Sequence, residues 1–400
     1  MELKGNKGEW SEIYIFFKLL SDGKVYAADK DMKKIRDKFL NIIRIIREEI
    51  KGKKYSYYTG EKIKIKLNEN EIATVDCSKI SNYKNKVWDM IVSSTETTFT
   101  NKDVTDFLES LSITKLKSPA EKSNDFFGGT QDIVLETQDY RSGINQIMGF
   151  SCKSDIDAGA TLFNASGDNT NFEYKVTGKI SEKIMEEFNA LVDSQGHTAV
   201  GKRMKFLRDK NLDVEFINPV GDIARENLIT CCGTEMPKII GGMLKYYFYE
   251  CRGEKTDVKD CLNYLAANDF AGYGFKNNYD TYRVRIENLL YSMFTGLRFG
   301  KRWNGRSDVN GGYIVVKKDG DVVAYHSCIA DEFKDFLLEK LRFETPSCTR
   351  HKCMEIYKKN GSYYIKFPLQ LRFSIKSSGK VVYKKNEKTV LYVAESNMLK

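Results

Sequence analysis

The chain has few of the features that mark disordered, membrane-spanning or secreted proteins. Its 400 residues include only 5 prolines but 23 tyrosines and 23 phenylalanines, and this aromatic-rich composition is typical of a chain that folds. No segment approaches the roughly 18 consecutive apolar residues of a membrane-spanning helix. The N-terminal segment carries Glu9 and Glu12 and has no small-residue cleavage site, so we do not expect a secretory signal. These absences favour a globular protein of the cytoplasm with no membrane partner.

Paired cysteine motifs are absent as well. The 9 cysteines include no C-x-x-C pair, and their number is odd. In a chain long enough to build its own core, this pattern indicates free thiols in a reducing compartment. Cys348, His351 and Cys353 lie close together in the sequence, but their spacing does not match the common zinc fingers or ribbons, and no fourth ligand is evident. We therefore do not expect a zinc site.

The charge balance is mildly basic. Lys and Arg number 64 against 55 Asp and Glu, which gives a net charge of +9. This excess is compatible with a polyanionic partner, but a charge of this size does not identify one by itself. The length allows one large domain or two of medium size. A change in composition near residue 190 leads us to predict two regions, residues 1–190 and residues 191–400.

The hydrophobic pattern predicts a mixture of helices and strands along the whole chain. Apolar residues at three- and four-residue spacing predict helices, and alternation predicts strands. The expected helices cover residues 7–20, 31–50, 81–92, 101–111, 237–250 and 281–294. The expected strands cover residues 24–28, 62–67, 132–136, 146–154 and 160–166, with further strands from Gly311 and Ser362 and a hairpin turn at 318–320. The predicted fold class is therefore mixed, α/β or α+β.

Two neighbouring predicted strands carry the first candidate site. Side chains alternate along the second strand, which reads IMGFSCKSD, so Ser151 and Lys153 share one face with the small Gly149. The apolar side chains between them face the other way and fit a core. Asp132 starts the preceding strand. Adjacent strands can therefore place a carboxylate, a hydroxyl and an amine side by side.

Such a group of side chains suits the metal-assisted cleavage of a phosphodiester bond. Mg²⁺ prefers oxygen ligands and keeps several waters, and it offsets phosphate charge and activates a water. A lysine can orient that water or stabilise the charge that develops in the reaction. A solvated pair of Asp and Lys on a surface is the alternative interpretation, because such pairs are common and contribute little. The spacing alone does not decide between the two.

Several longer stretches together resemble type II restriction endonucleases of the HpaII type. They are KGEWSEIYIFFKLL, GFSCKS followed by ATLFNASGDNTNFEY, DVNGGYIVVKKDGDVVAYH, RFETPSCTRH and YYIKFPLQLRF, which are spread in this order over almost the whole chain. The resemblance implies the wider PD-(D/E)xK nuclease group, whose core is a mixed β-sheet flanked by helices. It also implies that Asp132 is the first metal-binding carboxylate, that Lys153 is the catalytic lysine, and that Ser151 belongs to the same catalytic motif.

The sequence departs from the motif of that group at two positions. Gln131 stands where a proline usually precedes the aspartate, and Ser151 stands two residues before the lysine, where an acid is usual. Some members of the group with serine at this position recruit a glutamate from elsewhere. The candidates for this second metal-binding acid are Glu12, in the first predicted helix, and Glu136, on the same strand face as Asp132. For Glu12 the alternative is an exposed helical acid.

Three polar segments are candidates for contact with DNA. Amide, hydroxyl and guanidinium groups bind phosphates and base edges, and the family resemblance supports this use here. A turn, a loop before a strand and a surface strand are the respective alternatives, because the same residue types favour them. The candidates are Asn164, Ser166 and Asn171 in the first segment, Arg302, Arg306, Asp308 and Asn310 in the second, and Gln370 and Arg372 in the third.

The predicted function is the Mg²⁺-dependent, sequence-specific cleavage of double-stranded DNA, which leaves 5′-phosphate ends. The resemblance implies a short palindromic site of the CCGG kind, and a palindrome suggests a homodimer. It also implies a prokaryotic restriction-modification system in which a DNA methyltransferase protects the host. Two alternatives stay open. One is a DNA-binding protein that has lost its metal site through the serine at position 151, and the other is a structure-selective repair nuclease.

Overall fold

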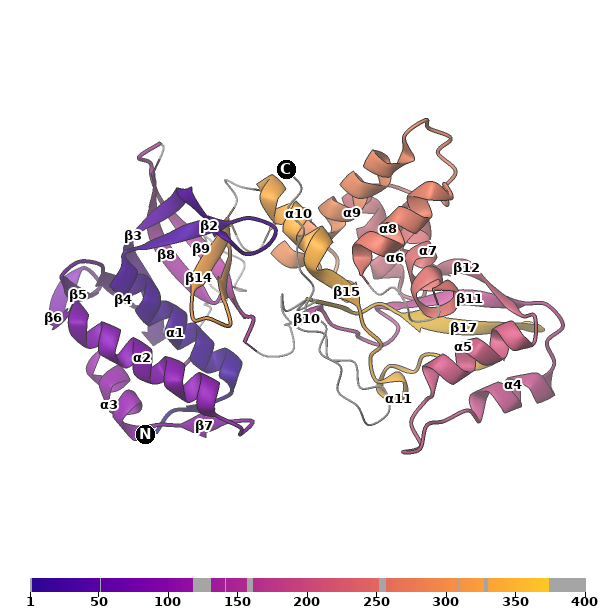
Figure 1. Ribbon diagram of the computed structural model, residues 1–400, viewed down its shortest axis with the longest axis horizontal. Coiled ribbons are helices and arrows are strands. Elements are labelled where there is room, and N and C mark those ends of the chain that lie inside the picture. The colour runs from indigo at the N-terminus through magenta and orange to yellow at the C-terminus, as the bar shows by residue number, and fades with distance from the viewer. Residues whose placement is uncertain are drawn as a thin grey trace, which may run out of the picture.

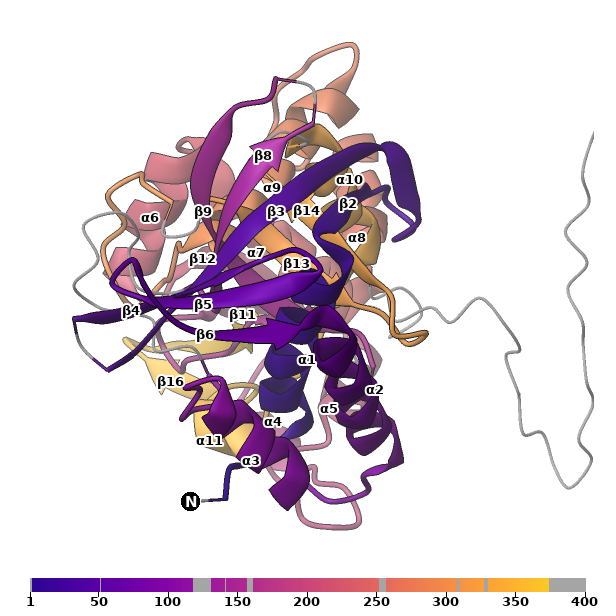
Figure 2. The ribbon, with the colours of Figure 1, turned by 90° about the vertical axis from the view of Figure 1, so that its left-hand side faces the viewer.

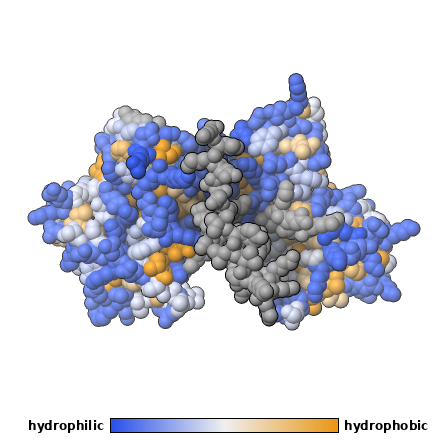
Figure 3. Space-filling view, in the orientation of Figure 1, coloured by the Kyte–Doolittle hydropathy of each residue, from blue (hydrophilic) through white to orange (hydrophobic). Residues whose placement is uncertain are grey.

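The computed structural model describes residues 2–50, 52–117, 131–140, 142–156, 161–251, 257–307, 310–326 and 330–373. Within these ranges the chain has a mixed α/β fold, which confirms the predicted class, and it is arranged as two lobes (Figure 1). The face shown in Figure 3 is largely hydrophilic, with small hydrophobic patches scattered over both lobes. Among the described residues, no helix has the length and apolar character that crossing a membrane requires.

The helices and strands alternate irregularly along the chain. The helices are α1 (Lys7–Asp22), α2 (Cys77–Ser93), α3 (Lys102–Ser110), α4 (Glu182–Asn189), α5 (Val200–Asp209), α6 (Asp222–Cys232), α7 (Met236–Lys245), α8 (Val258–Ala267), α9 (Asn278–Thr295), α10 (Ala330–Lys340) and α11 (Cys348–His351), and a π-helix, Tyr246–Glu250, continues α7. The strands are β1 (Lys4–Gly5), β2 (Lys24–Ala28), β3 (Lys34–Ile50), β4 (Lys53–Tyr58), β5 (Lys62–Leu67), β6 (Asn70–Asp76), β7 (Phe99–Thr100), β8 (Ile133–Asp139), β9 (Asn145–Ser154), β10 (Thr161–Phe163), β11 (Asn171–Thr177), β12 (Asp213–Pro219), β13 (Gly312–Val316), β14 (Val322–His326), β15 (Leu341–Phe343), β16 (Ile356–Lys359), β17 (Ser362–Pro368) and β18 (Leu371–Phe373).

A nine-stranded sheet forms the first lobe, in the order β2-β14-β13-β9-β8-β3-β4-β5-β6. Strand β9 has two neighbours: β13 runs parallel to β9, and β8 runs antiparallel to β9. Strand β2 also pairs with β3, so the strongly twisted sheet curls back on itself (Figure 2). Strands β13 and β14 come from the predicted region 191–400, while their partners come from the predicted region 1–190. The division into two domains stays a prediction, but the sheet draws strands from both regions.

Two hydrophobic cores lie on opposite faces of this sheet. Alternation along β13 sends Ile314 and Val316 into the first core, which α1 and α2 cover. The intervening Tyr313 and Val315 point into the second core, which continues through α6 to α9. In the second lobe, β12-β11-β17-β16 form one sheet, and a smaller sheet of β10-β18-β15 lies between the lobes. The central strands of the large sheet therefore separate the two cores and belong to both.

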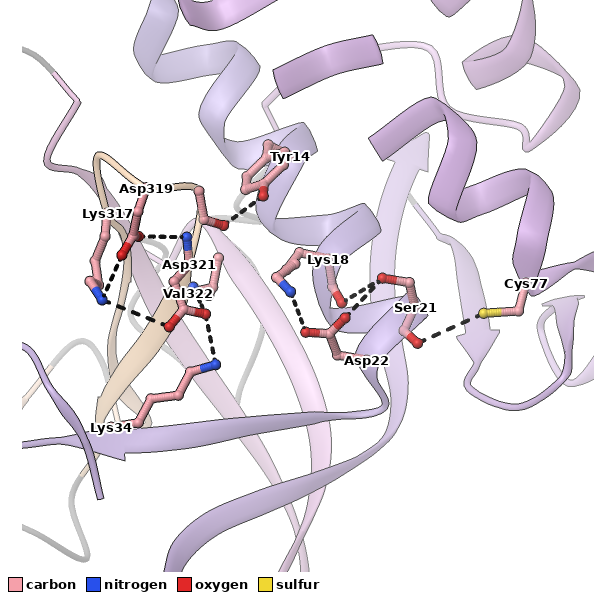
Figure 4. Close-up of polar contacts among 11 residues, drawn as sticks. Tyr14, Lys18, Ser21, Asp22, Lys34, Cys77, Lys317, Asp319, Asp321 and Val322 are labelled. Atoms are coloured by element: carbon pink, nitrogen blue, oxygen red, sulfur yellow. Dashed lines mark hydrogen bonds and ion pairs between the residues drawn. The ribbon is translucent and has the colours of Figure 1, made fainter. Parts of the chain in front are cut away.

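The turn between β13 and β14 is fastened to the N-terminal part of the chain (Figure 4). The Tyr14 hydroxyl donates to the Gly320 carbonyl over 2.6 Å, and burial raises the pKa of Tyr14 to about 12. Lys34 forms an ion pair of 2.7 Å with Asp321. The Gly320 N–H donates to the Lys317 carbonyl, which confirms the predicted turn. These contacts join segments that are far apart in the sequence.

The helix predicted over residues 31–50 is wrong, because this segment forms the long strand β3. The buried residues Leu40, Ile42 and Ile45 stand two and then three positions apart in the sequence. A bulge in the pairing with β8, between Ile42 and Arg44, shifts the alternation by one residue. The resulting three-residue step imitates helical spacing in the sequence, although the repeated isoleucines favour a strand.

Candidate active site

Asp132 stands directly before β8 and opposite Ser151 on β9. The register that pairs Ile133 with Phe150 places it there, and its backbone N–H donates to the Phe150 carbonyl over 2.8 Å. Its Oδ2 accepts two hydrogen bonds, one from the Ser151 hydroxyl over 2.7 Å and one from the Cys152 N–H over 2.8 Å. Ser151 is only 7% exposed. The structure thus brings the predicted carboxylate and the predicted serine into direct contact.

Lys153 follows Ser151 at the next position on the same face of β9, about 6.7 Å along the strand. Its Nζ lies 5.5 Å from the centre of the Tyr313 ring, a cation–π contact. Tyr313 is the register partner of Ser151 on β13. Asp132, Ser151 and Tyr313 therefore form a row across β8, β9 and β13. The amine of Lys153 lies over the ring of Tyr313, the last member of that row.

Glu12 reaches the same neighbourhood from α1, which packs across β9. Burial raises the pKa of the partly buried Glu12 to about 8, and the Asp132 carboxylate adds to the shift. The positive charges of Lys117 and Arg47 act in the opposite direction. Two carboxylates that raise each other's pKa repel when both are ionised. A cation between them would relieve the repulsion.

The donor atoms of this site suit a hard cation. Asp132 and Glu12 offer carboxylates, and Ser151 offers a hydroxyl. The carbonyl of Cys152 points to the same side of β9 as its N–H, which already binds Asp132. Mg²⁺ is commonly held by one or two carboxylates, and waters complete its shell. In the part of the chain that the structure describes, no group of three or more His, Cys, Asp or Glu residues is placed to hold a metal ion. A metal here would therefore rely on two acids and neutral oxygens.

Glu136, the other predicted metal-binding acid, lies away from this group. It stands four residues beyond Asp132 on the strand, which corresponds to about 13 Å. Its Oε2 accepts a 2.6 Å ion-pair hydrogen bond from Arg44, and Arg44 also binds Glu69 over 2.6 Å. This network occupies the Glu136 carboxylate. Glu136 is therefore engaged with Arg44, whereas Glu12 stays a candidate because the Asp132 charge contributes to its raised pKa.

The first DNA-contact segment contains both exposed and buried residues. Asn164 and Ser166 are exposed, and their contact with DNA stays a prediction. Asn171 is 0% exposed, and its Nδ2 donates to the His351 carbonyl over 3.0 Å and to Asp168 over 3.3 Å. Asn171 therefore fastens the segment to α11 and does not face a ligand in this arrangement.

The third DNA-contact segment makes internal contacts. Gln370 and Arg372 each donate to the Glu344 carboxylate over 2.6 Å. The side-chain oxygen of Gln370 also accepts from the Ala165 N–H over 3.2 Å. These bonds join β18 to β15 and to the segment that contains Asn164. The two residues thus support the surface that carries the first segment.

The second DNA-contact segment leads from α9 to β13. Arg302 is exposed and forms a 3.2 Å ion pair with Glu226, and Arg306 is exposed as well. The side-chain oxygen of Asn310 accepts from the Gly149 N–H over 2.8 Å, so Asn310 binds the candidate catalytic strand β9 itself. Asp308 lies outside the described residues. The segment thus presents arginines to solvent and ends beside the candidate catalytic group.

Two structural supports of the site were not predicted from the sequence. Asn227 of α6 is 1% exposed, donates to the carbonyls of Arg298 and Lys301 over 2.8 Å each, and accepts from the Trp303 N–H over 2.9 Å. A single asparagine inside a helix belongs to no motif, and only its position on the buried stripe of α6 would have signalled it.

The second unpredicted support is the buried ion pair of Arg47 and Glu49, whose atoms are 2.7 Å apart. Glu49 also accepts from the Thr114 N–H over 2.9 Å, and Arg47 donates to the Lys115 carbonyl over 2.8 Å. The pair lies close enough to Glu12 for the Arg47 charge to oppose the rise in its pKa. Because residues 31–50 were predicted to be a helix, Arg47 and Glu49 were not expected on the same buried face of a strand.

Comparisons with known proteins agree with the sequence resemblance. The model of the HpaII restriction endonuclease family matches residues 6–373. A relative described as "Type II restriction enzyme HpaII", from Haemophilus parainfluenzae, is 30% identical over 382 residues, which cover 92% of this chain and 98% of that protein. No solved structure matches the chain. The chain therefore belongs to the HpaII restriction endonuclease family, and this membership confirms the predicted enzyme class, a type II site-specific deoxyribonuclease.

Proposed function

We propose that the protein cleaves double-stranded DNA at a short palindromic site in a Mg²⁺-dependent reaction, with Asp132 and Lys153 at its catalytic centre. The observation that carries the proposal is the contact of Asp132 with β9, where Oδ2 accepts from Ser151 and Cys152 and Lys153 follows on the same face. This arrangement supports the proposal of a PD-(D/E)xK site in which serine replaces the second acid. Family membership supports DNA as the substrate.

Asp132, Glu12 and the carbonyl of Cys152 are the groups that would hold the metal ion. When bound, Mg²⁺ would offset charge on the scissile phosphate and favour a deprotonated water. The fit rests on the oxygen donors and on the raised pKa of Glu12, because a cation would replace the proton that Glu12 retains beside Asp132.

The remaining groups of the site orient the reactants. The Ser151 hydroxyl donates to Asp132 Oδ2 and fixes the direction in which the carboxylate points. Lys153 keeps its ammonium over the Tyr313 ring, from which it can orient the attacking water and stabilise negative charge on the phosphate. Fixed groups of this kind contribute to the rate because they need not reorganise during the reaction.

The finer features of the activity follow from the resemblance to HpaII-type enzymes. It supports a recognition site of the CCGG kind and 5′-phosphate ends. A two-fold symmetric site is most simply matched by a homodimer. A DNA methyltransferase of the same restriction-modification system would protect host DNA in the prokaryotic cytoplasm.

The test uses linear duplex DNA that contains CCGG sites, incubated with Mg²⁺ or with EDTA. We expect discrete fragments with Mg²⁺ and intact DNA with EDTA. Asp132→Asn and Lys153→Ala should each lower the cleavage rate by a factor of about 10² or more, because each removes a group that acts on the reacting atoms. Both variants should still bind DNA in Ca²⁺. Glu136→Gln is the matched control and should cleave normally, since Glu136 is engaged with Arg44.

Three outcomes would contradict the proposal. Normal cleavage by Lys153→Ala would remove the catalytic role of this lysine. Intact DNA that is nevertheless bound would favour the non-cleaving binding protein. Nicks confined to branched junctions would favour the repair nuclease.

A further inference from the structure

An arginine of the second lobe lies beside the candidate catalytic strands and belongs to none of the predicted segments. Arg298 follows the end of α9, and its side chain is exposed. Its NH1 group donates over 2.7 Å to the carbonyl of Met293, in the last turn of α9, and over 2.9 Å to that of Leu297, just after the helix. A guanidinium carries five N–H donors, and these two bonds use one nitrogen only. The other donors are left for a further partner.

The backbone of Arg298 is also held by a hydrogen bond. Its carbonyl accepts a 2.8 Å hydrogen bond from the buried Asn227, which also holds Lys301 and Trp303. The arginine is therefore held in place from both ends before any ligand arrives. Binding to a group fixed in this way costs little conformational entropy.

Tyr313 connects Arg298 with the catalytic group. The Tyr313 hydroxyl donates to the Phe294 carbonyl over 3.1 Å, next to the Met293 carbonyl that Arg298 binds. On the other side, the ring of Tyr313 carries the amine of Lys153. Burial raises the pKa of the Tyr313 phenol well above its usual range, the Arg298 guanidinium opposes this shift, and the Asp132 carboxylate adds to it. Tyr313 thus has the candidate catalytic Lys153 over its ring, and its hydroxyl binds the end of α9 to which Arg298 is also bound.

The charge of Arg298 is balanced differently from that of two of the three arginines predicted to bind DNA. Arg302 and Arg372 each form an ion pair with a glutamate, at 3.2 Å and 2.6 Å. Within the described residues, the hydrogen-bond partners of the Arg298 side chain are two neutral carbonyls. Its positive charge therefore remains available to an anion.

We propose that Arg298 binds a backbone phosphate of the DNA that occupies the Asp132–Lys153 site. The inference rests on the proposed nuclease function and adds a contact from the second lobe. A planar guanidinium matches two phosphate oxygens at once. Such a contact fixes the position of the duplex against β9 without reading its sequence. The alternative is that Arg298 only stabilises the negative end of the α9 dipole.

The test compares Arg298→Gln with the wild-type protein. Glutamine retains an N–H donor for the α9 carbonyls but loses the charge. Binding of a fluorescent duplex is measured in Ca²⁺ over a series of salt concentrations, with one CCGG duplex and one unrelated duplex. We expect the plot of log Kobs against log [salt] to become less steep by about 0.9, the value for one lost phosphate contact, on both duplexes. Arg208 donates a comparable 2.6 Å bond to the Tyr249 carbonyl from α5, which lies at the end of the second lobe away from the first (Figure 1). Arg208→Gln also loses the charge and retains an N–H donor, and it should keep the wild-type slope.

The outcomes separate this inference from the proposed function. An unchanged slope in Arg298→Gln, with or without a lower melting temperature, would show a helix cap only and would leave the catalytic centre intact. Failure of the wild-type protein to bind any duplex in Ca²⁺ would overturn both. Cleavage assays in Mg²⁺ give a second readout. A phosphate contact made in the ground state predicts a raised KM with a smaller change in kcat.

Discussion

At the scale of single residues, Glu12 shows how the fold changes the acid strength of a side chain. Its pKa is raised from 4.5 to about 8, chiefly by burial and then by Asp132. Between these two values the folded protein binds more protons than the unfolded chain does. The free energy of unfolding therefore falls as the pH rises through this range. The contribution that protonated Glu12 makes to it is fully present below pH 4.5 and is lost above pH 8.

Glu12→Gln should remove this pH dependence, because glutamine carries no charge at any pH. In EDTA, the melting temperature of the variant relative to the wild type should be similar near pH 4.5 and should increase progressively towards pH 8. Thermal unfolding at a series of pH values measures the difference. Glu9→Gln, on the same helix, keeps an acceptor for the Asn6 N–H in the helix cap and controls for the loss of a carboxylate from α1. A constant difference for Glu12→Gln at all pH values would refute the assignment.

Alanine substitutions at two glycines test how closely β13 packs against β14. Gly312 has a φ of +112°, and a Cβ added to it would lie 2.0 Å from the Tyr325 carbonyl oxygen. Gly305 has a φ of +80°, but no atom lies within 4 Å of its added Cβ. Gly305→Ala should therefore cost only the backbone strain of about 1–2 kcal/mol. Gly312→Ala should cost clearly more, because it also separates β13 from β14. Chemical denaturation compares the two, and equal losses would contradict the packing described here.

At the scale of elements, local signals identify some segments and long-range pairing decides others. The capping box of Asn6 and Glu9 and the left-handed Gly23, with a φ of 64°, mark both ends of α1 within the sequence itself. Strand β3 has no comparable local signal, because its conformation depends on β2, β4 and β8, which pair along its two edges.

The same distinction separates the site residues that could be predicted from those that could not. Asp132 and Ser151 lie on consecutive antiparallel strands, so alternation along a single hairpin already brings them together. The ion pair of Glu136 with Arg44 depends on the register between β8 and β3, which no local pattern reveals. The burial of Asn171 likewise depends on α11, which follows much later in the chain.

The loop that follows α9 gives a prediction at this scale, because a single side chain organises it. Asn227→Ala removes three hydrogen bonds, to Arg298, Lys301 and Trp303, and should lower the free energy of unfolding by about 1–3 kcal/mol for each buried group left unpaired. Asn227→Asp should be at least as destabilising, because a carboxylate cannot donate to the two carbonyls and would face them with a negative charge.

The control for this loop is Asn304→Ala, which removes one exposed hydrogen bond to the Arg306 N–H and should change stability by no more than about 0.5 kcal/mol. Chemical denaturation gives the stabilities, and DNA binding in Ca²⁺ should weaken with Asn227→Ala. If Asn227→Asp were as stable as the wild type, Asn227 would not hold the loop in the way described.

At the scale of the whole molecule, one sheet separates two cores and joins the two lobes. The hairpin of β13 and β14 contributes Ile314 and Val316 to the first core and Tyr313 and Val315 to the second. The candidate catalytic strand β9 is the parallel neighbour of β13. Tyr313, on whose ring the Lys153 amine lies, therefore joins the candidate catalytic group only when the chain has returned from the second lobe. The DNA contact proposed for Arg298 would come from that lobe, and Tyr313 would link it to the candidate catalytic strand.

This topology predicts that residues 1–190 will not fold on their own. Without β13 and β14 the fragment leaves the edge of β9 unpaired, lacks the buried Ile314 and Val316, and loses the Tyr14–Gly320 and Lys34–Asp321 contacts. We expect aggregation or the absence of a cooperative thermal transition in circular dichroism. Co-expression with residues 191–400 should recover a soluble complex, because the two pieces then supply every strand of the sheet. A sharp unfolding transition of the isolated fragment would show instead that the hairpin of β13 and β14 only adds to a first lobe that is already complete.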